Sequence, residues 1–146
     1  MTGYKDFDVP ILSGFPDLSQ GLLPLWILVI GIVAIMNTVQ NYLTPGLTKR
    51  VYNHQTQLVT SLQSRTFSVW TFTSGLIRIY TAYNIRDPAL YQLSIGTFLI
   101  ALTHFLSELI IFKSTRLLNG IGIISPLVVA SVSCFWMVTQ YNYYIS

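Results

Sequence analysis

The chain has 146 residues, of which 52% are hydrophobic and only 9% are charged. Ordinary soluble domains cover their core with a charged surface, so this composition excludes them and predicts an integral membrane protein. The net charge of +3 bears on membrane orientation more than on nucleic-acid binding, and a single cysteine, Cys134, excludes a disulfide framework.

The first predicted span covers residues 22–42. It begins beside Pro24 and ends before Pro45, as expected for a helix start and for the turn beyond its end. The side that meets other helices is marked by small and polar residues at helical spacing, which are Gly31, Ala34, Thr38 and Asn41. We interpret the amides Asn37 and Asn41 as groups that bond to neighbouring helices, in preference to a ligand site.

The second predicted span covers residues 66–84 and contains Arg78. Its apolar residues barely offset the cost of a central arginine, about 2.5 to 3.5 kcal/mol, so this helix needs neighbours. Small or polar residues form one stripe along it and bulky residues form another: Ser64, Ser68, Thr71, Gly75, Arg78 and Ala82 against Val69, Phe72, Leu76, Ile79 and Tyr83. We expect the small stripe to face other helices and the bulky stripe to face lipid.

The third predicted span covers residues 88–112, with Asp87 as its N-cap and Pro88 in its first turn. The short connection predicts that it is the antiparallel neighbour of the second span. Its polar stripe consists of Ser94, Thr97, Ala101, His104 and Glu108. We expect the polar stripes of these two helices to face each other.

The fourth predicted span covers residues 122–144. Either Ser125 caps a helix that begins at Pro126, or Pro126 kinks a helix that begins at Ile121. The sequence thus predicts an all-α membrane protein: a four-transmembrane-helix bundle with short loops, forming a single domain over residues 1–146.

Basic residues are concentrated in two loops, 43–65 and 113–121. These loops carry Lys49, Arg50, Arg65, Lys113 and Arg116, whereas the opposite side carries Lys5 and Arg86. The positive-inside rule therefore places both loops in the cytosol and both termini across the membrane. Within the longer loop, we expect a short amphipathic segment at the membrane interface.

Three readily ionised side chains lie inside the predicted spans, and such residues are candidate functional groups: Arg78, His104 and Glu108. One histidine and one carboxylate are too few for a zinc site, and the sequence contains no phosphate loop, nucleophile elbow or His-Glu-x-x-His motif. We therefore predict no catalytic, metal or cofactor site. We favour a hydrogen-bonded polar core; the alternative is a small proton-coupled transporter that uses Glu108 and His104.

The rise per residue of a helix indicates which of the charged side chains lie at the same depth. Arg65 and Glu108 lie roughly 29 and 27 Å from the turn between the second and third spans, whereas Arg78 lies roughly 11 Å from it. We therefore hypothesise that Arg65 pairs with Glu108. We expect Arg78 to extend toward the outer surface or to bond groups of helices 22–42 or 122–144.

Several segments carry a family resemblance. They are Ser64-Arg65-Thr66-Phe67-x-x-Trp70-Thr71-Phe72, Arg78-x-Tyr80, Ala101-Leu102-x-His104-Phe105-x-Ser107-Glu108 and Pro126-Leu127-Val128-Val129. In this order and spacing they closely resemble the ergosterol biosynthetic protein 28 family, over essentially the whole chain. The candidate structural or interaction residues are Arg65, Trp70, Arg78, Tyr80, His104 and Glu108.

The resemblance implies a multi-pass protein of the endoplasmic-reticulum membrane that is not itself an enzyme. Together with the positive-inside rule, it leads us to expect both termini in the lumen. It implies a scaffold that tethers the sterol C-4 methyl oxidase, the 3β-hydroxysteroid dehydrogenase/decarboxylase and the 3-keto sterol reductase, with sterol C-24 methyltransferase as a further contact. Membrane lipid is the other expected partner, nucleic acid is not, and a homo-oligomer is compatible with the sequence.

Overall fold

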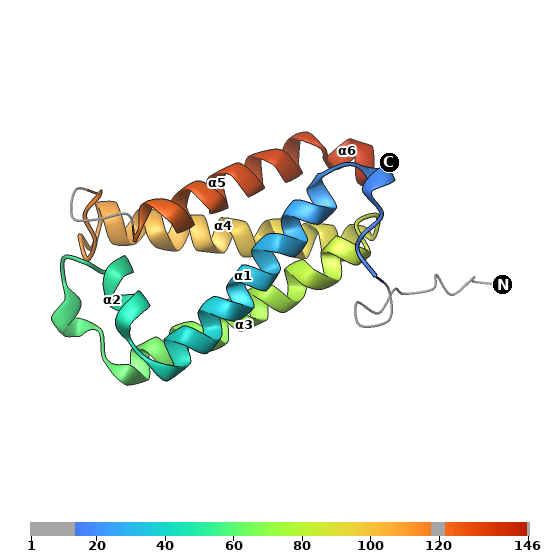
Figure 1. The fold of residues 1–146 in the computed structure, drawn as a ribbon. Helices are drawn as coiled ribbons and strands as arrows, with labels where there is room; N and C mark the ends of the chain where they lie inside the picture. Colours follow the sequence, from blue (N-terminus) through green and yellow to red (C-terminus); the bar gives the residue numbers. More distant parts are fainter. Residues whose placement is uncertain (1–13, 118–121, 146) are drawn as a thin grey trace.

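A computed structural model describes residues 14–117 and 122–145. This part of the chain is helical and contains no strand. A short 3-10 turn, η1 (Leu18–Gln20), precedes the long helices. The helices are α1 (Leu23–Leu43), α2 (Gly46–Val51), α3 (Ser61–Tyr83), α4 (Pro88–Ile110), α5 (Ile124–Thr139) and α6 (Tyr141–Ile145), with a second 3-10 turn, η2 (Thr56–Leu58), between α2 and α3. Figure 1 shows the four long helices side by side, with α2 at one end and both ends of the described chain at the other.

Local capping explains where α3 and α4 begin. The Asp87 side chain accepts a hydrogen bond from the Leu90 amide, and Pro88 occupies the first turn, as predicted. The Thr60 hydroxyl caps α3 by accepting from the Gln63 amide at 3.1 Å. Helix α3 therefore begins at Ser61, five residues before the predicted start, and Arg65 belongs to the helix and not to a loop.

Helices α1 and α3 form the closest helix pair and run antiparallel. A Cβ atom added to Gly31 would lie 3.2 Å from the Gly75 carbonyl oxygen, and one added to Gly75 would lie 3.2 Å from the Gly31 carbonyl oxygen. Further along, the Ser64 hydroxyl donates to the Asn41 carbonyl at 2.6 Å. The two stripes of small residues therefore meet each other, because glycine lets the backbones approach closely.

The small stripe of α3 is buried along its length, apart from the half-buried Thr71, whereas Val69, Phe72 and Leu76 of the bulky stripe are exposed. This confirms the inward side, and it confirms the outward side for these three residues only. Ile79 and Tyr83 of the bulky stripe are half-buried and pack against buried apolar residues. The predicted facing of the polar stripes of α3 and α4 is correct only in part. Ser64, Ser68 and Gly75 lie against α1, and the polar contacts with α4 come from Arg78 and Thr81.

The final predicted span, 122–144, is not one helix. Helix α5 begins at Ile124, its N-cap is Ile123, and it ends at Thr139. The short helix α6 follows after Gln140. Pro126 is thus the third residue of α5, so the proposal that Ser125 caps the helix is wrong, and the alternative start at Ile121 lies outside the described residues. A proline in the first turn removes only an amide that has no helical partner.

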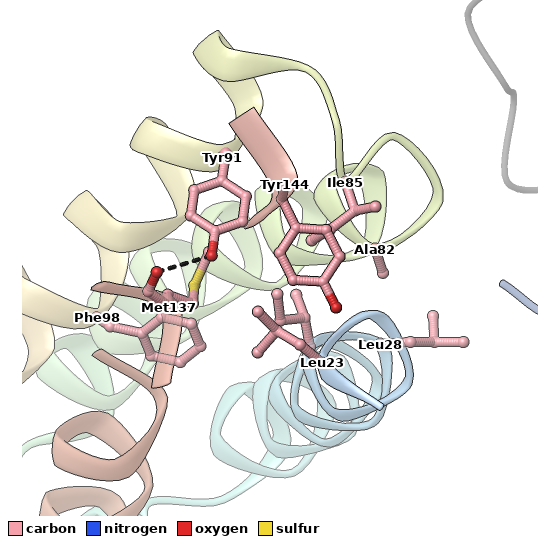
Figure 2. Close-up of a cluster of buried hydrophobic side chains, with 9 residues drawn as sticks. Leu23, Leu28, Ala82, Ile85, Tyr91, Phe98, Met137 and Tyr144 are labelled. Atoms are coloured by element: carbon pink, nitrogen blue, oxygen red, sulfur yellow. Dashed lines mark hydrogen bonds between the residues drawn. The ribbon is translucent and has the colours of Figure 1, made fainter. Parts of the chain in front are cut away.

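A hydrophobic cluster closes the end of the bundle at which the described termini lie. Figure 2 shows it between α1, the α3–α4 turn, α4, α5 and α6. The Tyr91 hydroxyl donates to the Met137 carbonyl at 2.7 Å, and the Tyr144 hydroxyl donates to the Gln20 carbonyl at 2.6 Å. These bonds tie α4 to α5 and the last helix to the segment before α1. We refer to this end as the terminal end.

The loops join at the opposite end, which we call the loop end. The amides of His54 and Gln55 both donate to the Ser114 carbonyl. Asn53 and Arg116 exchange two hydrogen bonds, at 2.9 and 2.8 Å, between the Asn53 side chain and the Arg116 backbone. The connection between α1 and α3 is therefore joined to the segment after α4.

Two of the described helices, α1 and α4, are long and apolar enough to cross a membrane. Helix α3 has 23 residues but is more polar, with two arginines and many hydroxyl side chains. Helix α5 is apolar but has 16 residues, about 24 Å of helix, which is short of a hydrocarbon core of about 30 Å.

Candidate functional site: a groove between the helices

A groove of about 900 Å³ lies between the four long helices. Helices α3 and α4 form its floor, and α1 and α5 form its sides. At the terminal end α1 and α5 are joined, because the Trp26 indole donates to the Ser133 hydroxyl at 2.9 Å. From there the two helices diverge toward the loop end, where α2 lies across the space between them (Figure 1). The lining residues of α1 and α5 thus lie on either side of the groove.

The groove is lined by aromatic, small, branched aliphatic and polar residues. Its aromatic side chains come from α3 and α4: Phe67, Trp70, Phe98 and Phe105. Its alanines come from three helices: Ala34 of α1, Ala101 of α4 and Ala130 of α5. An apolar lining with a few polar groups is typical of pockets that hold small hydrophobic molecules.

Arg78 lies in the floor of the groove and is 8% exposed. Its Nε donates to the Thr97 hydroxyl at 3.1 Å, and its guanidinium carbon lies 4.0 Å from the centre of the Phe98 ring. The expected extension toward the outer surface, or bonding to helices 22–42 or 122–144, is therefore wrong. The side chain of a helical residue points toward the helix N-terminus, which brings Arg78 level with Thr97 of α4.

Polar groups also gather where the groove meets the loop end. Lys49, Arg50 and Asn53 line it there, together with Asn37 and Asn41. Asn41 is buried and fully engaged: its side chain accepts from the Thr48 hydroxyl at 2.9 Å and bonds Asn37. The bond from Thr48 of α2 to Asn41 agrees with the prediction that the amides bond to neighbouring helices, whereas the bond between Asn37 and Asn41 lies within α1.

A second polar cluster surrounds His104, beside a small pocket of about 280 Å³. The Tyr52 hydroxyl lies 2.7 Å from His104 Nε2, and the Trp70 ring packs edge-on against the imidazole, with centroids 5.6 Å apart. Burial, followed by the negative charge of Glu108, raises the pKa of Tyr52. The phenol therefore keeps its proton near neutral pH and can donate it to a neutral imidazole.

The hypothesised pair between Arg65 and Glu108 is wrong. Among residues 14–117 and 122–145 no salt bridge joins them; the Ser114 hydroxyl donates to Glu108 at 2.5 Å, and Arg65 is exposed. Lys113, with a φ of 54°, turns the chain back after α4, so Ser114 reaches Glu108. Arg65 begins about 100° from the small stripe, and this rotation turns it outward.

The predicted site residues separate into three places. Trp70 and Arg78 line the groove, whereas His104 and Glu108 belong to the second cluster. Arg65 is exposed, and Tyr80 lies in the last turn of α3, where its carbonyl accepts from Asn84. Across the described residues no three histidine, cysteine, aspartate or glutamate side chains converge as metal ligands.

Sequence analysis placed Thr97 on the inward polar stripe of the third span but did not pair it with Arg78. It did not identify Tyr52 or Ser114. Tyr52 and Ser114 lie in loops, where no periodicity indicates which way a side chain points. The contacts of such loop residues are determined by the path of the loop in the tertiary structure, so the sequence pattern does not predict them.

A family model and several known proteins that match this chain carry closely related names. A family model described as "Erg28 like protein" matches residues 23–135. "Ergosterol biosynthetic protein 28" of Candida albicans is 40% identical over 146 residues, which is the whole of both chains. The Schizosaccharomyces pombe protein of the same name is 45% identical over 130 residues (89% of this chain and 91% of that protein), and the human homolog is 38% identical over 119 residues (81% and 84%). No solved structure matches the chain.

Proposed function

Because the chain belongs to the Erg28-like family, we propose that it is a non-catalytic scaffold for sterol biosynthesis in the endoplasmic-reticulum membrane. Its partners in this proposal are the sterol C-4 methyl oxidase, the 3β-hydroxysteroid dehydrogenase/decarboxylase and the 3-keto sterol reductase, with sterol C-24 methyltransferase as a further contact. The observation that carries the proposal is similarity along the whole chain to relatives named for ergosterol biosynthesis.

The proposal includes four membrane crossings, by α1, α3, α4 and the combined α5 and α6. Helices α1 and α4 have the length and composition for this. Helix α3 buries its arginine and its small residues against other helices and presents Val69, Phe72 and Leu76 outward. The two loops lie together at one end of the bundle, and both described termini lie at the other end. An even number of membrane crossings requires this arrangement.

Orientation follows from the basic residues of the loop end. In the proposed topology this end is cytosolic and both termini are lumenal. A glycosylation acceptor fused to either terminus is expected to be modified in cells, whereas one inserted between Lys49 and Gln63 is expected to remain unmodified. Modification of the loop acceptor alone would show the inverted orientation.

The loop end is the surface that we assign to partner contact. Lys113 and Arg116 are exposed there, and the bonds of Asn53 and Ser114 hold their segment against the other loop. A surface built from two joined loops is better ordered than either loop alone, so less entropy is lost when a partner binds.

No observation favours the proton-transport alternative. Glu108 is bonded by Ser114 at the loop end, and it belongs to the small second pocket and not to the groove between the helices. The family description also names no transport activity. We therefore propose only the scaffold function.

The test is recovery of sterol-synthesis enzymes with the tagged chain in mild detergent, measured by quantitative mass spectrometry. The Lys113→Glu, Arg116→Glu double variant is expected to lower recovery at least about fivefold, because reversed charges at an interface oppose association. Arg86→Glu is the control, since Arg86 is exposed at the terminal end. Unchanged recovery would contradict the assigned surface, and sterol turnover by the purified chain alone would contradict the non-catalytic role.

A further inference from the structure

We propose that the groove binds a sterol-class lipid that carries an acidic oxygen group, and that this group sits on Arg78. The inference rests on the proposed role in sterol biosynthesis for the class of lipid. The acidic group, the mode of entry and the residues are argued from the groove itself.

The charge of Arg78 is the first step. The side chain is 8% exposed, and its Nε is bonded to Thr97. Among residues 14–117 and 122–145, no carboxylate forms a salt bridge with it, and no acceptor bonds its terminal amino groups. A buried guanidinium without a counter-ion is costly, and it has a planar set of donors that matches a carboxylate. An acidic ligand would supply both the missing charge and the missing acceptors.

The size of the groove is the second step. Small-molecule pockets have volumes of about 300 to 1,000 Å³, and the groove has about 900 Å³. The groove therefore has the volume of a small-molecule pocket.

The composition of the walls is the third step. The lining combines aromatic rings of α3 and α4 with alanines and with branched aliphatic side chains of α1 and α5, such as Val33 and Val129, beside a few polar groups. This is the composition of pockets that hold apolar small molecules. The proposed role in sterol biosynthesis then favours a sterol over a fatty acid as the occupant.

The opening of the groove is the fourth step. The groove is lined by α1 and α5, which are joined at the terminal end through Trp26 and Ser133 and diverge from there (Figure 1). Val33 of α1 lines the groove and is 52% exposed, so it lies at the mouth. In the proposed topology this mouth faces the hydrocarbon core, and a lipid would enter sideways without crossing water.

Native mass spectrometry of the full-length chain in sterol-free detergent tests the proposal with three probes. Cholesteryl hemisuccinate is the acidic sterol, cholesterol is the neutral sterol and oleate is the acidic non-sterol. We expect cholesteryl hemisuccinate to bind at least tenfold more tightly than either of the others. Arg78→Met is expected to weaken its binding at least tenfold and to leave cholesterol binding unchanged.

A second variant keeps the test decisive if Arg78→Met does not fold. Val33→Trp places a large ring in the mouth and is expected to weaken binding of both sterols at least tenfold. Val39→Trp is its control, because Val39 is 54% exposed on the same helix and is not among the groove-lining residues. Both valines have room for a larger side chain.

The outcomes distinguish this inference from the scaffold proposal. Equal binding of cholesterol and cholesteryl hemisuccinate that is insensitive to Arg78→Met would overturn the acidic-ligand assignment, and equal binding of oleate would overturn the sterol class. If Val33→Trp lowered enzyme recovery and left probe binding unchanged, the groove would be a docking site for a protein helix. Absence of probe binding with normal enzyme recovery would remove the groove proposal alone, whereas probe binding without enzyme recovery would remove the scaffold alone.

Discussion

Gly122→Ala is expected to destabilise the protein by at least about 3 kcal/mol. A Cβ atom at this position would lie 2.1 Å from the Arg50 carbonyl oxygen and 2.6 Å from its carbonyl carbon. Both are backbone atoms, so no side chain can rotate away, and α2 would have to separate from the start of α5. In detergent, we expect the midpoint of thermal unfolding to fall by roughly 6 to 12 °C.

Gly96→Ala is the matched control for this change. Gly96 lies inside α4, and a Cβ atom there would have no atom within 4 Å. Alanine favours a helix over glycine by about 1 kcal/mol, so this variant is expected to be as stable as the original chain or more so. Equal midpoints for Gly122→Ala and the unsubstituted chain would show that the contact between α2 and the start of α5 is not maintained in solution.

Gly75→Val is expected to separate α1 from α3. The first added carbon would lie 2.9 Å from the Ile35 Cδ1 atom and 3.2 Å from the Gly31 carbonyl oxygen. Ile35 can rotate, but the carbonyl cannot, and the two further methyl groups of valine must also fit at the crossing. We expect a loss of about 2 to 3 kcal/mol of unfolding free energy, with Gly96→Val as the control.

The crossing of α1 and α3 also supports the groove, so Gly75→Val has a second readout. Ser74 and Arg78 line the groove from the same helix, on either side of Gly75. If α3 shifts, its arginine shifts with it, and binding of the acidic sterol probe should fall together with stability. A stable Gly75→Val protein with unchanged probe binding would contradict the close approach of the two backbones.

Local patterns in the sequence determined the starts of α1 and α4 and the sides of α1 and α3 that are buried. Pro24 and Asp87-Pro88 act within a few residues, and a stripe of small residues at helical spacing needs no knowledge of the partner to identify the inward side. The burial of Ser68 and Arg78, and the outward position of Val69 and Phe72, followed from this alone.

Tertiary structure decided which inward sides meet. Both α1 and α4 offer small or polar stripes to α3, and the close approach of Gly31 and Gly75 assigns most of that stripe to α1. The sequence pattern states that a stripe is buried, but packing of whole helices decides which neighbour covers it.

In the candidate site, the sequence likewise identified individual residues but not the residues that they contact. Trp70, Arg78, His104 and Glu108 were identifiable as unusual residues within predicted spans. Their partners were not: the pairing of Arg65 with Glu108 failed because Ser114 reaches the carboxylate when the chain turns back at Lys113. Depth along a helix is a local quantity, whereas the rotation of each helix and the path of each loop depend on every contact in the fold. For this reason the groove, whose lining comes from five helices, became visible only in the tertiary structure.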